Sequence, residues 1–178
     1  LSTQQMRALE TEDLAAISST NFAALTTAQV QALTGSQVGS FTTGQVSQLG
    51  TAQVAALNYL QVAQLSASKL TAMSNDQIKA LTTAQVSGLT STQMAGITTE
   101  QVSAMTSAQA AAIDTGVLAK MSTAQIQSMN TSAVANLTTA QVAKLTNAQV
   151  GAFTAAQVKA LVNAQLVALT TDQAGSLT

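Results

Sequence analysis

The sequence predicts an all-α solenoid of very short helices, with one capped helix in each eight-residue repeat. Three observations predict it. Large apolar residues recur every eight residues from Leu1 to Leu177, and a second apolar series follows five residues later in each repeat, from Met6 to Ala174. Between the two series, Ser, Thr, Asn or Asp is followed three residues later by Gln in most repeats. We call these eight-residue units octads and number their positions from the first apolar residue.

Each octad contains the residues that start a helix. In the octad that begins at Leu25, Thr26 at position two is a favoured N-cap, and Gln29 at position five completes the spacing of a capping box. The Thr hydroxyl would accept from the N–H of Gln29, and the Gln side chain would reach back to the N–H of Thr26. Leu25 and Val30, at positions one and six, have the spacing of a hydrophobic staple. The remaining positions are mostly small, so neighbouring backbones can approach closely.

Each helix must also end, because the next octad opens a new capping box. An octad therefore holds about one and a half turns of helix, which is roughly 9 Å. Helices this short are unstable alone and persist only when stacking buries both apolar series. We expect two octads in each coil of the solenoid. Stacked at about 8–10 Å, the octads would then form a rod on the order of 100 Å long.

Two other architectures fit the period less well. In one continuous helix, eight residues overshoot two turns by about 80°, so the apolar stripe would circle the helix. A β-solenoid suits the many Thr and Val residues. However, Leu25 and Val30 would then point to opposite faces of a strand, and the recurring Ala and Gln favour a helix.

The whole chain, residues 1–178, is predicted to be a single octapeptide-repeat solenoid of 22 octads. Residues 1–24 are less regular, and residues 25–178 lie near the consensus. The clearest interior departures are Tyr59 and Leu60, where small polar residues normally stand, and the octad that begins at Ile113. Tyr59 and Leu60 fit ordinary sequence drift better than a contact point.

The composition excludes several functional classes. Charged residues make up 7% and the net charge is −1, so the chain lacks the basic surface of nucleic-acid binders and of membrane-surface helices. His and Cys are absent, which removes the commonest general base and all thiol chemistry. No stretch approaches the roughly 18 apolar residues of a membrane span. The first residue is a Leu in repeat register, which is typical of a mature or excised piece.

Few residues qualify as candidates for chemistry. Glu12 and Asp13 are adjacent carboxylates, but acidic residues also favour the first turn of a helix, and no His or Lys accompanies them. Asp114 and Gly116 match only a fragment of a calcium loop. Asn130 and Asn136 open N-glycosylation sequons, a weak signal in so polar a chain. We predict no catalytic, cofactor-binding or metal-binding residue, no cofactor and no enzymatic activity.

The run Leu81-Thr-Thr-Ala-Gln-Val-Ser-Gly-Leu89 resembles the octad arrays of large exported bacterial surface proteins, often described as adhesin-like or haemagglutinin-like. This resemblance implies an extracellular, non-catalytic spacer. TAL-effector repeats open with a similar run, but they are much longer and contain a second helix with a base-reading pair. This chain has no such second helix, so DNA recognition is not expected.

The expected function is that of an extracellular rod, stalk or filament at a bacterial cell surface. Both apolar series continue to the two ends of the chain, which predicts exposed apolar ends that continue a longer array or join copies head to tail. The expected partner is therefore the protein itself, with no nucleic acid and no membrane span. The alternative is a binding surface for ice or glycans, made of paired threonines such as Thr26-Thr27, Thr42-Thr43, Thr82-Thr83, Thr98-Thr99 and Thr138-Thr139.

Overall fold

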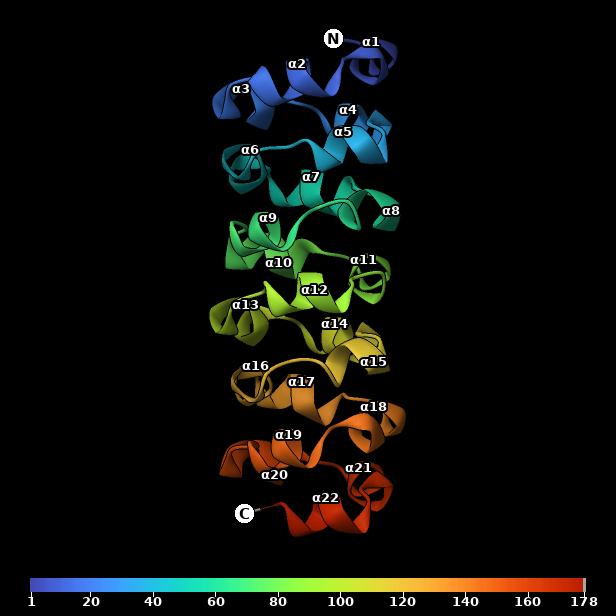
Figure 1. Cartoon of the computed structure of the whole chain (residues 1–178), viewed down its shortest axis with the longest axis vertical. Helices are drawn as coiled ribbons and strands as arrows, with labels where there is room; N and C mark the ends of the chain where they lie inside the picture. Colours follow the sequence, from blue (N-terminus) through green and yellow to red (C-terminus); the bar gives the residue numbers. More distant parts are fainter. Residues whose placement is uncertain (178) are drawn as a thin grey trace.

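The computed structural model describes residues 1–177, and each octad in that range contains one short helix (Figure 1). No strand occurs within these residues, so the predicted all-α solenoid is confirmed and the continuous helix and β-solenoid are wrong. The helices are α1 (Thr3–Ala8), α2 (Thr11–Ala16), α3 (Ser19–Ala23), α4 (Thr27–Ala32), α5 (Gly35–Gly39), α6 (Thr43–Gln48), α7 (Thr51–Ala56), α8 (Tyr59–Val62), α9 (Ala67–Thr71), α10 (Asn75–Ala80), α11 (Thr83–Ser87), α12 (Ser91–Ala95), α13 (Thr99–Ala104), α14 (Ser107–Ala112), α15 (Thr115–Leu118), α16 (Thr123–Ser128), α17 (Thr131–Ala135), α18 (Thr139–Lys144), α19 (Asn147–Gly151), α20 (Ala155–Ala160), α21 (Asn163–Ala168) and α22 (Thr171–Gly175).

The helices begin as the capping-box pattern predicts. In α4 the backbone N–H of Thr26 donates to Oε1 of Gln29 over 2.7 Å, and the N–H of Gln29 donates to the Thr26 hydroxyl over 3.2 Å. Where position two is Gly50 or Val162, only the glutamine half of the box forms, because these residues have no side-chain acceptor. A polar position two therefore improves a helix start that the glutamine can also make alone.

Many helices end directly in an extended corner, and others, such as α5 with Ser40 at φ −85° and ψ −9°, have one αR residue first. After α4, Leu33 has φ −64° and ψ 148°, and Thr34 has φ −74° and ψ 163°. The N–H of Leu33 still donates to the carbonyl of Val30 over 3.3 Å, which closes the last turn. No residue in the described part of the chain has a positive φ, so none of these corners uses the left-handed residue that commonly ends a helix.

The expectation of two octads per coil is wrong. Every helix from α1 to α19 packs against the helix three octads later, and no comparable packing joins helices two octads apart among the described residues. Hydrogen bonds also join residues 28 and 31 positions apart, just under four octads. One coil thus holds between three and four octads. The physical reason is the extended corner, which turns the chain by less than the reversal that an antiparallel helix pair needs.

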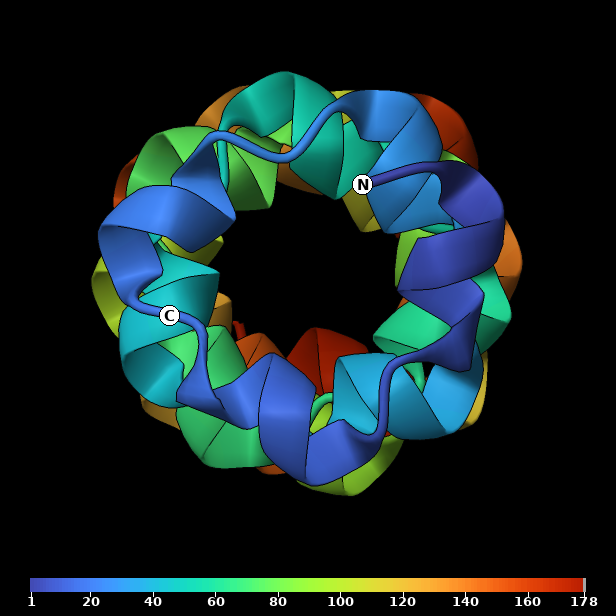
Figure 2. The same ribbon diagram turned by 90° about the horizontal axis from the view of Figure 1, so that it is seen from above.

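The stack forms a rod with the two termini at opposite ends (Figure 1). Seen from the N-terminal end, the chain runs clockwise as it recedes, so the superhelix is right-handed (Figure 2). With between three and four octads per coil and about 8–10 Å between stacked helices, the rod is about 50–60 Å long. The 100 Å expected from the sequence was too long because it assumed two octads per coil.

Both apolar series form one continuous core. The position-six side chains from Met6 to Val150 are essentially inaccessible, and the position-one side chains from Leu33 to Leu161 are buried. The two series meet between coils: the rings of Phe22 at position six and Phe41 at position one lie 4.6 Å apart in an edge-to-face contact. The core therefore runs along the rod rather than closing within one coil.

Small residues let stacked helices approach closely. At Gly96, just after α12, an added Cβ would lie 2.6 Å from the Cβ of Ala67 in α9. Gly44 in α6 has only the hydroxyl of Thr42 nearby, at 3.8 Å, so its missing side chain is not needed for packing. The structure thus separates glycines that packing requires from those that it does not.

Candidate functional site

The most specific polar structure in the molecule is the row of glutamines at position five. Gln85 shows the geometry. Its Oε1 accepts from the N–H of Thr82, as in the capping box, over 2.6 Å. Its Nε2 donates to the carbonyls of Val54, at 2.9 Å, and Leu57, at 2.5 Å, which lie at the C-terminal end of α7 in the coil before. One buried amide therefore joins the start of one helix to the end of another.

The same bridge recurs along the rod. Each of these glutamines donates Nε2 to the carbonyl 28 residues earlier over 2.5–2.8 Å, and they are Gln29, Gln37, Gln45, Gln53, Gln61, Gln77, Gln85, Gln93, Gln101, Gln109, Gln125, Gln141, Gln149, Gln157, Gln165 and Gln173. All but Gln29 are at most 6% exposed. We call this row the glutamine ladder.

The ladder explains why position five is Gln and not Glu. A capping box accepts either residue, since both have an oxygen for the N-cap N–H. Only Gln also carries N–H donors. The carbonyls at the end of the helix in the coil before need such donors, because a helix leaves its last carbonyls without partners. No buried side-chain nitrogen or oxygen in residues 1–177 lacks a hydrogen-bond partner. The repeated Gln was read from the sequence as a helix start alone, and its second function was missed.

In two of the three interior octads where position five is not Gln, another side chain still donates a hydrogen bond to the coil before. Lys69 donates Nζ to the carbonyl of Gly39, and burial lowers the pKa of Lys69. Beside Ala133, the N-cap Asn130 donates Nδ2 to the carbonyls of Met105, at 2.8 Å, and Ser103, at 3.1 Å.

Val117 differs from these two residues, because its side chain has no donor for the carbonyls 28 and 31 residues earlier. The octad of Val117 therefore contains a gap in the ladder.

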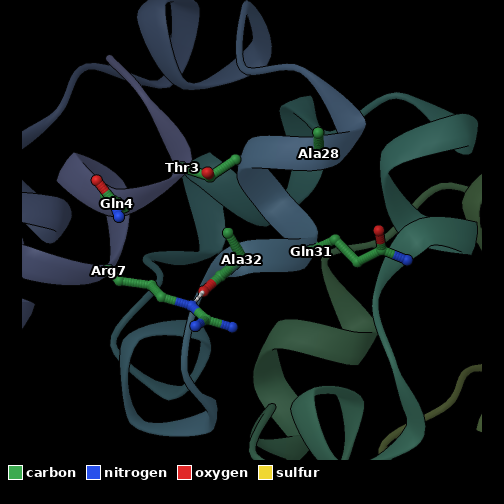
Figure 3. A pocket seen from close by; sticks show the side chains of 6 residues that line it. All are labelled: Thr3, Gln4, Arg7, Ala28, Gln31 and Ala32. Atoms are coloured by element: carbon green, nitrogen blue, oxygen red, sulfur yellow. Dashed lines mark hydrogen bonds between the residues drawn. The ribbon is translucent and has the colours of Figure 1, made fainter.

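One surface hollow of about 480 Å³ lies between α1 and α4 (Figure 3). It is open to solvent, and Arg7 is its one charged lining residue. The Nε of Arg7 donates to the carbonyl of Ala32 over 2.9 Å, so this side chain already makes a contact between coils (Figure 3). The hollow contains no acid or base beside this guanidinium, which does not act as a proton-transfer group.

The structure places the acidic candidates at helix starts. Glu12 and Asp13 are exposed in the first turn of α2, where carboxylates favour the helix dipole. Asp114 is the N-cap of α15, and its Oδ1 accepts from the N–H groups of Gly116, at 2.8 Å, and Val117, at 3.2 Å. No group of three or more Asp, Glu, His or Cys residues that could hold a metal occurs among residues 1–177. Asp114 thus serves as a cap, and Glu12 and Asp13 occupy a helix start that favours negative charge.

The other singled-out residues lie on the surface or support the stack. Tyr59 and Leu60 are exposed on α8, and the Tyr59 ring lies against Gly88 of the next coil. Asn130 caps α17 through Oδ1, which accepts from the N–H of Ala133 over 2.8 Å, while Asn136 donates Nδ2 to the carbonyl of Ser132. A glycan on Asn130 would remove the Nδ2 contacts between coils.

Glu100 is exposed, and the hydrogen bonds from its own backbone N–H, and then from the Thr98 and Thr99 side chains, lower its pKa. Among the described residues, no helix has the length and apolarity needed to cross a membrane.

Comparison with known proteins gives one family. The ALTTAQ repeat model matches residues 6–43, 67–99, 110–147 and 142–178, which together are well over half of the chain. The run Ala80-Leu-Thr-Thr-Ala-Gln85 spells that repeat. No curated protein matches the sequence. Built from octads that carry this motif, the chain belongs to the ALTTAQ repeat family.

Proposed function

We propose that this chain is a non-catalytic structural rod that serves as a spacer or stalk in an exported bacterial surface protein. The observation that carries the proposal is the glutamine ladder, which repeats one bond pattern from Gln29 to Gln173. The buried polar side chains of this range are glutamines, and each of them bonds coil to coil. Such an interior serves to hold a stack at constant geometry. The resemblance to octad arrays of adhesin-like proteins supports a location outside the cell.

A spacer gains length in proportion to its octads, and this gives the first test. Inserting a second copy of residues 81–136, which is seven octads, adds about two coils and should lengthen the rod by about 15–20 Å. Small-angle X-ray scattering measures the maximum dimension of the parent and the extended chain. A maximum dimension that does not grow with the insertion would contradict a rod.

Location needs a separate test. An antibody against the purified chain should label intact cells of the bacterium that makes it, without permeabilisation. Labelling that appears only after the cells are opened would remove the extracellular part of the proposal and leave the rod.

A threonine-rich binding surface remains the second hypothesis, and the geometry supports it less. The hydroxyls of Thr26, Thr42, Thr82, Thr98 and Thr138 accept from the backbone N–H at position five. In addition, α4, α11 and α18 lie on one side of the rod and α6 and α13 on the other, so the paired threonines are divided between two sides (Figure 1). Thermal hysteresis or binding on a glycan array would revive this function.

A further inference from the structure

The octad of Val117 contains two backbone groups that a ladder glutamine would have paired. In a regular octad such as that of Gln85, the amide oxygen accepts from the N-cap N–H, and the amide nitrogen donates to the carbonyl 28 residues earlier. The corresponding groups at the Val117 octad are the N–H of Asp114 and the carbonyl of Leu89. Within residues 1–177, neither of these two groups has a hydrogen bond to another protein group.

The nearby Asp114 side chain does not supply the missing donor. Asn130, the N-cap of another octad without Gln, donates Nδ2 to the carbonyl of Met105, which lies 25 residues earlier. Asp114 holds the equivalent position, since it stands 25 residues after Leu89. However, its Oδ1 accepts from two backbone N–H groups of α15, and an ionised carboxylate has no hydrogen to donate.

The carbonyl of Leu89 belongs to a residue that lies inside the stack. Leu89 is only 3% exposed, and a buried carbonyl without a hydrogen bond is costly. Such groups are nearly always paired, either with protein or with ordered water. Val117 is partly exposed, whereas the interior ladder glutamines are buried, and its side chain ends two bonds short of the place of a Gln amide nitrogen. Water can therefore approach from the side on which the amide would lie.

We propose that the octad of Val117 binds an ordered water molecule in place of the glutamine amide. The water donates one hydrogen to the carbonyl of Leu89 and accepts from the N–H of Asp114, so it combines a donor with an acceptor as the amide does. The Asp114 carboxylate is a third partner, for the second hydrogen, and two to four polar partners are what a buried water needs. This site adds a bound ligand to the rod without changing its proposed function.

High-resolution crystal structures of the wild type and of Val117→Gln give the first test. The wild type should show a water oxygen within about 2.7–3.2 Å of both the Leu89 oxygen and the Asp114 nitrogen. In Val117→Gln the amide should occupy that place, and the water should be gone. A wild-type structure without this water, or with a protein donor on the Leu89 carbonyl, would overturn the proposal.

NMR on ¹⁵N-labelled protein tests the same site in solution. A nuclear Overhauser effect between the Asp114 N–H and bound water should be present in the wild type and in Val117→Ala, and absent in Val117→Gln. The matched control is the N–H of Gly50, an N-cap that also precedes a Thr but bonds to Oε1 of Gln53 over 2.6 Å, and it should show no such effect. Equal water contact at Asp114 in the wild type and in Val117→Gln would contradict the site. Neither result bears on the length test of the rod.

Discussion

Replacing Gln85 by Glu separates the two functions of the position-five side chain. The introduced carboxylate keeps an oxygen for the N–H of Thr82, so the helix start is preserved. It loses the donor that now serves the carbonyls of Val54 and Leu57. Each buried acceptor left without a partner costs about 1–3 kcal/mol, so the variant should lose about 2–6 kcal/mol. This is a large share of the roughly 5–15 kcal/mol that stabilises a typical domain.

The loss at Gln85→Glu should also depend on pH. Burial beside carbonyl oxygens raises the pKa of the introduced carboxyl above its unfolded value of about 4.3, since both effects disfavour the charged form. The protonated acid again offers one donor. The folded variant therefore keeps its stability below pH of about 4 and loses it as the pH rises through the folded-state pKa.

Urea unfolding followed by circular dichroism at pH 4 and pH 7 measures both effects. The matched control is Gln127→Glu, an exposed position in α16, which should change stability by less than about 0.5 kcal/mol at either pH. If Gln85→Glu were as stable as this control at pH 7, the carbonyls of the coil before would not need the donor. The ladder would then be a by-product of stacking rather than its cause.

Three further experiments test separate parts of the packing. Gly96→Ala should destabilise the rod by about 1–3 kcal/mol, because the new Cβ would lie 2.6 Å from that of Ala67. The control Gly44→Ala, which has room for its Cβ, should stabilise the rod by about 0.5–1 kcal/mol. Thermal unfolding of both variants measures these changes, and equal effects would refute the close approach at Gly96. Val117→Gln should raise the free energy of unfolding by about 1–2 kcal/mol, because the amide would donate to the carbonyls 28 and 31 residues earlier. A loss of stability in urea unfolding would show that those carbonyls already have partners. Because the pKa of Lys69 is lowered in the fold, the unfolded chain binds this proton more tightly, and the contribution of Lys69 to stability increases as the pH rises toward about 10.4. Lys69→Gln should remove that pH dependence from urea midpoints measured between pH 8 and 10.5. An unchanged pH dependence would contradict the burial of the Lys69 ammonium group.

The helices could be predicted from the sequence because their signals are local. The cap at Thr26, the box with Gln29 and the staple between Leu25 and Val30 all lie within six residues, and the structure confirms the capping box. Burial of the two apolar series followed from the same argument, since helices of this length are stable only when stacked.

The number of octads in each coil could not be predicted in the same way. Its size depends on the corner angle set by residues such as Leu33 and Thr34, and an extended corner leaves no sequence signature like the Gly of a left-handed cap. The second bond of Gln85 was hidden for a related reason, because its partners lie 28 and 31 residues away. One signal was present: no position five is Glu, although a capping box tolerates Glu.

The glutamine ladder also limits what the interior can do. Most octads repeat the same buried amide, and the interior of the stack departs from it at Lys69, Val117 and Ala133. Variation is also found on the surface and at the ends, as at Tyr59 on α8 and Asp13 on α2. In a protein of this design, we expect functional differences between arrays to arise from the number of octads and from the chemistry of the terminal coils.

Hydrogen exchange of the glutamine side-chain amides, followed by NMR on ¹⁵N-glutamine-labelled protein, tests the central claim most directly. The account predicts slow exchange for the buried ladder amides, such as those of Gln85 and Gln141, and fast exchange for exposed ones such as Gln48 and Gln127. Uniformly fast exchange in a protein that is helical by circular dichroism would show that the amides bond to water instead of to the coil before, and it would contradict the ladder.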